Sequence, residues 1–349
     1  MTRRVFALAA VVAIAVLTSG TGSAQELQYL IFERYIEPLR LQSGIPGLSA
    51  AVVRDGRIEW EKGFGLQDVE HSIAASPDTL YPIGGATQAM TGVLLGICTD
   101  RRQVDVDTAI HQWVPAFPHP AATVRHVLAH SATGRFQYDP GLYAQLTPVV
   151  DACSGRPYRV NAAIEILERL GMYASVPGLD LGTPGSPSRL QFDEARLARF
   201  SDSLRRLATP YVVDRNGKAV KTEYTSTNID AGTGMVSTVR DLAKFDIALD
   251  AGVPMSTSTL EQMWSQTVVG GVAQPTGLGW FVQVSSLERL VWTFGHVPDA
   301  GSALILKVPG KRATLILLAN SPGLAVGANL EQADVTASPF VKAFLRLFL

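Results

Sequence analysis

The sequence predicts an α/β (α+β) fold in which one antiparallel sheet is built from both chain ends and flanked by helices. Two strand-like runs, 48–54 and 57–64, flank Asp55-Gly56, a dipeptide typical of tight hairpin turns. Four more runs with strand patterns lie in the last third of the chain, at 276–285, 289–297, 302–308 and 314–319. The region between, roughly 80–270, has mostly helical patterns. We therefore expect a helical lobe inserted between the two sheet-forming ends.

The first 24 residues have the features of an export signal. Arg3 and Arg4 precede an uninterrupted apolar run over 5–17, and Gly22-Ser23-Ala24 offers a small-residue cleavage site. The run is too short for a stable membrane span, which needs about 20 apolar residues. We expect a signal peptide over 1–24, a single domain over 25–349 and a periplasmic or secreted location.

The composition narrows the range of partners and cofactors. The 349 residues carry 30 basic and 31 acidic side chains without a basic run, which argues against nucleic-acid binding. No cofactor is expected. Export would permit a disulfide between the two cysteines, Cys98 and Cys153. Each lies in an apolar helical pattern, which favours buried free thiols but leaves their pairing open.

The helical patterns have one central member. Residues 86–97 carry apolar or small side chains on nearly every face, as expected for a helix buried in the core of a large domain. The start of this helix is a natural place for a functional site. Other helices are predicted over 25–41, 142–154, 162–171, 192–208 and 339–349, and Ser237 and Thr238 are expected to cap a helix that follows them.

The segment from Ile83 to Thr91 is similar to the start of the central helix in the β-lactamase and penicillin-binding-protein serine hydrolases. The resemblance is strongest to the class C, esterase and D-aminopeptidase branch, whose pattern places a Ser and a Lys in a Ser-x-x-Lys arrangement. Segments 45–56, 123–131 and 231–245 also match, in family order. The resemblance covers about 25–349 and implies the fold of that superfamily.

The chemistry that the resemblance implies depends on two positions. In the family, the Ser attacks an acyl carbon, the Lys and a Tyr manage its proton, and backbone N–H groups hold the oxyanion. Gly85 stands at the Ser position and Gln88 at the Lys position. Glycine cannot form an acyl-enzyme, and a glutamine amide is no base. The family Tyr corresponds to Tyr138, and the family His on the facing strand corresponds to His296.

Three functional hypotheses follow. The first is an inactive exported protein that binds a peptide-like or acyl small molecule, or a protein partner, in a cleft formed by Gly85, Tyr138, His296 and Asp299. The N–H groups of Gly85 and Asp299 would bind an oxygen there. The second is an active esterase, D-peptidase or β-lactamase-like enzyme with a relocated nucleophile, Thr87 or Ser131, assisted by Tyr138 or His296. The third is a structural or interaction protein whose cleft is closed. Separately, Tyr138 and His296 could be remnants or packing groups.

His126 and His130 raise a separate question about metal binding. Spaced four apart, they could share one helix face, as some metal ligands do. Neither an adjacent Glu nor a third candidate ligand accompanies them. Structural roles are therefore favoured for both, and no metal site is expected.

Overall fold

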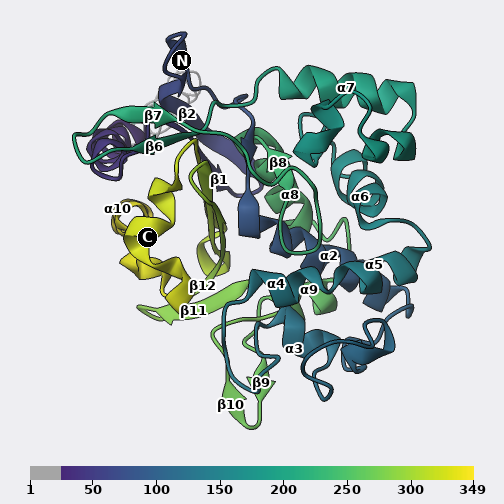
Figure 1. The fold of residues 1–349 in the computed structure, drawn as a ribbon. Helices are drawn as coiled ribbons and strands as arrows, with labels where there is room; N and C mark the ends of the chain where they lie inside the picture. The colour runs from purple at the N-terminus through teal and green to yellow at the C-terminus, as the bar shows by residue number, and fades with distance from the viewer. Residues whose placement is uncertain (1–24) are drawn as a thin grey trace, which may run out of the picture.

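A computed structural model describes residues 25–349, so the predicted signal peptide lies outside the described residues. Figure 1 shows a sheet with helices on both faces and a helical lobe beside it, and the first described helix, over residues 25–42, lies on the same side of the sheet as the C-terminal helix. Within 25–349, no helix combines the length and hydrophobicity that a membrane span requires.

The main sheet confirms the predicted assembly from both chain ends. Its order is β11-β12-β13-β14-β1-β2-β3, and β1 pairs antiparallel with both β2 and β14. The N-terminal hairpin therefore completes a sheet begun by the C-terminal strands. Its strands are β1 (Gly47–Arg54), β2 (Arg57–Asp68), β3 (Ile73–Ala74), β11 (Phe281–Ser285), β12 (Glu288–Val297), β13 (Gly301–Val308) and β14 (Ala313–Ala319).

Alternate side chains of the sheet fill two cores, as the pleat requires. In β1, Ala50 and Val52 contribute to an outer core that also contains Phe32 of the first helix and Phe344 of α10 (Pro339–Phe348). Ala51, one residue along, contributes to an inner core shared with α2 (Thr87–Asp100) and α8 (Val239–Asp250). The inner core thus joins the sheet to the lobe that carries the candidate site.

The central helix is buried as predicted. Every residue of α2 from Thr87 to Cys98 is buried, which explains the absence of charge on that stretch. The lobe also contains α3 (Val124–Leu128), α4 (Pro140–Ala144), α5 (Thr147–Ser154), α6 (Tyr158–Asn161), the π-helical continuation η3 (Ala162–Glu168), α7 (Glu194–Leu204) and α9 (Thr257–Met263). Of these, α5, η3 and α9 contact α2 directly.

Short elements complete the fold. A three-stranded sheet in the order β4-β8-β5 lies beside the start of α2, and two small hairpins, β6-β7 and β9-β10, project from the body. These strands are β4 (Tyr81–Pro82), β5 (Val176–Pro177), β6 (Tyr211–Val213), β7 (Ala219–Lys221), β8 (Met235–Ser237), β9 (Val268–Val269) and β10 (Val272–Ala273). The 3₁₀ helices are η1 (Gly84–Ala86), η2 (Ile110–Gln112), η4 (Leu179–Gly182), η5 (Pro187–Gln191), η6 (Pro309–Lys311), η7 (Pro322–Leu324), η8 (Val326–Ala328), η9 (Leu330–Gln332) and η10 (Val335–Ala337).

Some predicted boundaries were wrong for local reasons. The helix expected over 142–154 is divided between α4 and α5, and Pro148 lies in the first turn of the second helix, where its missing N–H does no harm. The strand expected over 276–285 begins only at Phe281, because a turn with Gly279 at φ +83° precedes it. The expected cap is confirmed at Thr238, whose side chain accepts from the Asp241 N–H, whereas Ser237 ends β8.

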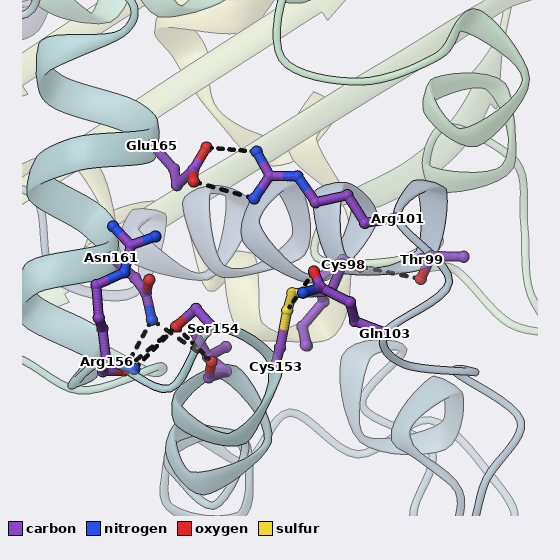
Figure 2. The surroundings of a disulfide bond; sticks show 11 residues. Cys98, Thr99, Arg101, Gln103, Cys153, Ser154, Arg156, Asn161 and Glu165 are labelled. Carbon is purple, nitrogen blue, oxygen red and sulfur yellow. Dashed lines mark hydrogen bonds and ion pairs between the residues drawn. A yellow bond between two sulfur atoms is a disulfide. The ribbon is translucent and has the colours of Figure 1, made fainter.

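The expectation of two free thiols was wrong. Cys98, near the end of α2, forms a disulfide with Cys153 of α5, 55 residues further along (Figure 2). Their Cα atoms lie 6.1 Å apart, within the span of a disulfide. The bidentate pair of Arg101 with Glu165 lies nearby. Apolar surroundings therefore accompany a disulfide here, because both helices end in the same core.

Candidate functional site

The site is built where the start of α2 meets strand β12. The Ile83 N–H donates to the Met235 carbonyl of β8, and Gly84 follows at φ +50°. A Cβ on Gly84 would lie 3.0 Å from the backbone nitrogen of His296. The left-handed conformation and the close strand both require glycine. This contact fixes Gly85 at the junction of helix and sheet.

Gly85 faces Tyr138 across a very short gap. A Cβ at position 85 would lie 2.5 Å from the Tyr138 hydroxyl oxygen and 3.1 Å from the Phe294 carbonyl oxygen. The Tyr138 hydroxyl thus occupies space that any side chain on residue 85 would need. Restoring a serine there would require Tyr138 to move.

Gln88, one turn further along α2, is joined to a buried histidine. The His130 Nε2 lies 2.9 Å from the Gln88 Oε1, and the Asp139 N–H donates to the His130 Nδ1 at 3.3 Å. Because Nδ1 accepts, Nε2 carries the proton and donates to Gln88. Burial lowers the pKa of His130 to about 3, against a weaker opposing effect of the Asp139 charge. The Gln88 Nε2 has no hydrogen-bond partner within 25–349.

Tyr138 is held by aromatic neighbours. Its ring centroid lies 4.8 Å from that of His130 and 5.1 Å from that of Phe294. The ring is partly exposed, but its hydroxyl end is enclosed. This enclosure raises the pKa of the phenol well above its ordinary value, and the Glu331 charge raises it further. Near neutral pH, Tyr138 is therefore a hydrogen-bond donor and not a base.

An open cleft of about 300 Å³ lies over these residues. Its lining brings together Gly85, Tyr138 and His296, which the sequence had placed far apart in the chain. Asp299 does not contribute to this lining. It is exposed in the turn after β12 at φ +55°, and its carbonyl accepts a hydrogen bond from Thr222.

The two candidates for a relocated nucleophile lie elsewhere. Thr87 is fully buried, and its Oγ1 accepts from the Met235 N–H at 3.2 Å. Ser131 is also buried; its hydroxyl donates to the His126 carbonyl, and the residue borders a separate depression of about 420 Å³. Neither hydroxyl contributes to the lining of the cleft that holds Tyr138 and His296.

The two histidines weighed as metal ligands have other roles. The His126 Nδ1 accepts from the Thr123 N–H in a capping box at the start of α3, while both ring nitrogens of His130 are engaged with Gln88 and Asp139. Among residues 25–349, no group of three or more His, Cys, Asp or Glu side chains is arranged to hold a metal ion.

Sequence reasoning missed two residues that shape the site. For His130, the sequence favoured a structural role but did not identify the Gln88 amide as its partner. Glu331, which lines the cleft, follows no motif and comes from the short helix η9 far along the chain. An unmatched amide at a family Lys position could have prompted a search for its partner. No sequence signal pointed to Glu331.

This fold, with a cleft between the start of a buried helix and a sheet strand, is that of the β-lactamase-related serine hydrolases. The chain belongs to the Beta-lactamase family, whose model matches residues 32–337. "Protein flp" of Staphylococcus aureus (strain NCTC 8325 / PS 47) is 32% identical over 99 residues, 26% of this chain and 20% of that protein. "Teichoic acid D-alanine hydrolase" of Staphylococcus aureus (strain MRSA252) is 28% identical over 95 residues, 27% of this chain and 23% of that protein. The matched part thus spans about a fifth of these relatives.

Solved structures show the same fold. A penicillin-binding protein homologue from Pyrococcus abyssi, described as octameric, superimposes with a TM-score of 0.72 at 21% identity, over 90% of this chain and 76% of that one. A D-amino acid amidase from Ochrobactrum anthropi SV3, complexed with L-phenylalanine amide, gives a TM-score of 0.66 at 19% identity, over 90% and 99%. The expected fold class is confirmed.

Proposed function

We propose that this protein is an exported member of the family that binds an acyl or peptide-like ligand in the cleft without covalent turnover. The observation that carries the proposal is the contact between Gly85 and Tyr138. The position of the family nucleophile has no side chain, and a protonated phenol fills the space in which one would lie.

Gln88 and His130, the neighbours of Gly85 and Tyr138 on the helical side, supply no substitute base. An activated nucleophile needs a base within hydrogen-bond reach. The Gln88 amide cannot accept a proton near neutral pH, and the pKa of His130 of about 3 keeps that ring neutral. Thr87 and Ser131 are each engaged with a backbone group outside the cleft. These contacts argue against the alternative of a relocated nucleophile.

Ligand binding is supported by the shape and the donors of the cleft. Its volume of about 300 Å³ argues against a structural protein with a closed cleft. The N–H groups of Gly84 and Gly85 have no acceptor among the described residues, and they lie at the start of a long helix, where an oxygen is favoured. A carbonyl oxygen is a suitable partner. The names of two similar proteins, a D-alanine hydrolase and a D-amino acid amidase, support an acyl ligand.

Export is supported by the disulfide. Disulfides persist in oxidising compartments and are rare in reducing ones. The Cys98–Cys153 bridge therefore agrees with the signal peptide expected over residues 1–24. Export would be tested by fractionating cells that produce the full chain and sequencing the N-terminus of the exported form, which should begin at Gln25.

Binding and turnover are tested on the same sample. Purified protein, isotopically labelled for NMR, would be titrated with N-acetyl-phenylalaninamide in both chiral forms while hydrolysis is followed in the spectra. We expect shifts of the Gly84, Gly85 and Thr233 amide signals, no product, and loss of the shifts in Thr233→Trp, which fills the cleft. Unshifted signals would refute the binding proposal. Product that disappears in Thr87→Ala or Ser131→Ala would establish the relocated nucleophile instead.

A further inference from the structure

The charge of the cleft comes from one carboxylate. Glu331 is the only Asp or Glu in the lining, and neither Lys nor Arg contributes to it. Among the described residues, Glu331 forms no ion pair. Its negative charge nevertheless reaches the enclosed hydroxyl of Tyr138, whose pKa it raises. The cleft therefore presents to a ligand a negative charge that no Lys or Arg in its lining offsets.

The backbone around Glu331 is held in an unusual conformation. Asn329 and Ala333, which flank the 3₁₀ helix η9, both have left-handed backbone angles, at φ +46° and +61°. Such angles are unfavourable for residues with a Cβ, above all for Ala333, and they persist where the surroundings enforce them. Leu330 supplies an anchor, because it is fully buried in the outer core. The strained turn thereby fixes the outward-facing Glu331 at the cleft.

The rest of the site offers donors. The Gly84 and Gly85 N–H groups lack acceptors, and the Tyr138 phenol is protonated, so this part of the cleft suits a neutral carbonyl oxygen. A ligand carboxylate would meet repulsion from Glu331, and the lining contains neither Lys nor Arg to offset it; His296 and Tyr138 are its other titratable groups. The ligand that satisfies both features combines a carbonyl group with a positive charge.

We infer that the cleft selects α-aminoacyl compounds, such as amino-acid amides, esters or peptide N-termini, with the ammonium group paired to Glu331. The carbonyl oxygen of the ligand accepts a hydrogen bond from the N–H groups of Gly84 and Gly85. The side chain of the ligand packs on the apolar wall formed by Pro82, Leu179 and Val297. This inference rests on the proposed function, and it deepens it by naming Glu331 as the residue that determines ligand charge.

The test compares a free amine with its acetylated form. Phenylalaninamide and N-acetyl-phenylalaninamide, each in D and L forms, would be titrated calorimetrically into the purified protein at low salt near neutral pH. We expect at least one free amine to bind about fivefold more tightly than its acetylated form, the upper range for a partly exposed ion pair. Added salt, or a pH above about 8 where an α-amino group loses its proton, should remove the preference.

Two variants locate the effect. Glu331→Gln keeps the shape of the side chain and should abolish the preference, whereas Glu194→Gln, which removes the same charge from an exposed position at the start of α7, should preserve it. Equal binding of amine and acetylated amide to the unmodified protein would overturn this inference and leave the proposed acyl binding intact. A preference that survives Glu331→Gln would also overturn it. Absence of binding by every amide would overturn both proposals.

Discussion

The Tyr138 hydroxyl oxygen lies 2.5 Å from the position that a Cβ on Gly85 would occupy. The two residues are thus complementary in shape, because the glycine leaves the Cβ position empty and the Tyr138 phenol fills the space beside it. Tyr138 is in turn packed against His130 and Phe294, so it cannot withdraw without disturbing an aromatic cluster. The glycine at position 85 and the present position of the tyrosine therefore belong to one arrangement.

Substituting Gly85 tests this arrangement energetically. Gly85→Ala should lower the free energy of unfolding by about 1–3 kcal/mol, the usual cost of overpacking. Tyr138→Phe removes the clashing oxygen, so the double variant should lose less than the sum of the two single variants. The coupling would be measured by urea unfolding of all four proteins. Gly327→Ala, at a glycine with open space around its Cβ position, is the control and should change little. Additive effects would show that the two residues do not compete for space.

Buried His130 makes stability depend on pH. Its pKa in the folded protein is about 3, below the ordinary value of 6.5. Because the unfolded chain binds the proton more readily, this contribution to stability is complete above pH 6.5 and is lost as the pH falls toward 3. The expected loss is about 1.4 kcal/mol per pH unit.

The measurement is chemical unfolding between pH 6.5 and about 5, above the range in which most carboxylates titrate. The slope should be reduced in His130→Gln, which has no proton to gain. His119→Gln, at a histidine outside the site, should keep the slope of the unmodified protein. A slope that is unchanged in His130→Gln would assign the pH dependence to other groups.

The disulfide should stabilise the folded lobe because it restricts the conformations of the unfolded chain. A bridge that closes a loop of 55 residues restricts the unfolded ensemble by about 4 kcal/mol in the chain-entropy model. The Cys98→Ser, Cys153→Ser double variant should therefore unfold at a markedly lower urea concentration. Reducing the unmodified protein, with thiol titration to verify reduction, should have the same effect. An unchanged midpoint after verified reduction would contradict this account.

A buried ion pair links the sheet to α8. The Lys307 Nζ lies 2.9 Å from the Asp246 carboxylate and 2.7 Å from that of Asp250, and Lys307 is almost fully buried. Lys307→Met should cost about 3–5 kcal/mol, because it leaves buried Asp246 without its partner. Adding Asp246→Leu should recover much of that loss. Lys311→Met, which removes an exposed lysine paired with Glu288, should have little effect on the unfolding midpoint.

The sequence predicted the fold well because its signals are repeated along the chain. The Asp55-Gly56 hairpin, the uncharged central helix and the four C-terminal strand patterns each specify local structure, and they agree on one sheet made from both ends. Local packing caused the errors. Gly279 turns the chain just before β11, and the pairing of Cys98 with Cys153 depends on how two distant helices meet.

The site was predictable only where a family motif marks a position. Gly85, Tyr138 and His296 could be named from the sequence, and all three line the cleft. The distance between Gly85 and Tyr138 could not be foreseen, because it depends on how the aromatic cluster packs. Glu331 could not be identified from the sequence for another reason. An isolated glutamate between two left-handed residues has no periodicity or motif, and only the folded turn brings it to the cleft.

The most direct test of the central claim is intact-mass spectrometry of the purified protein after incubation with a fluorophosphonate and with a penicillin. Both reagents form covalent adducts with activated serine or threonine nucleophiles. Because Gly85 has no side chain and the Tyr138 phenol is protonated, we predict that the mass of the protein stays unchanged with both. A stoichiometric adduct on any residue lining the cleft would contradict the account.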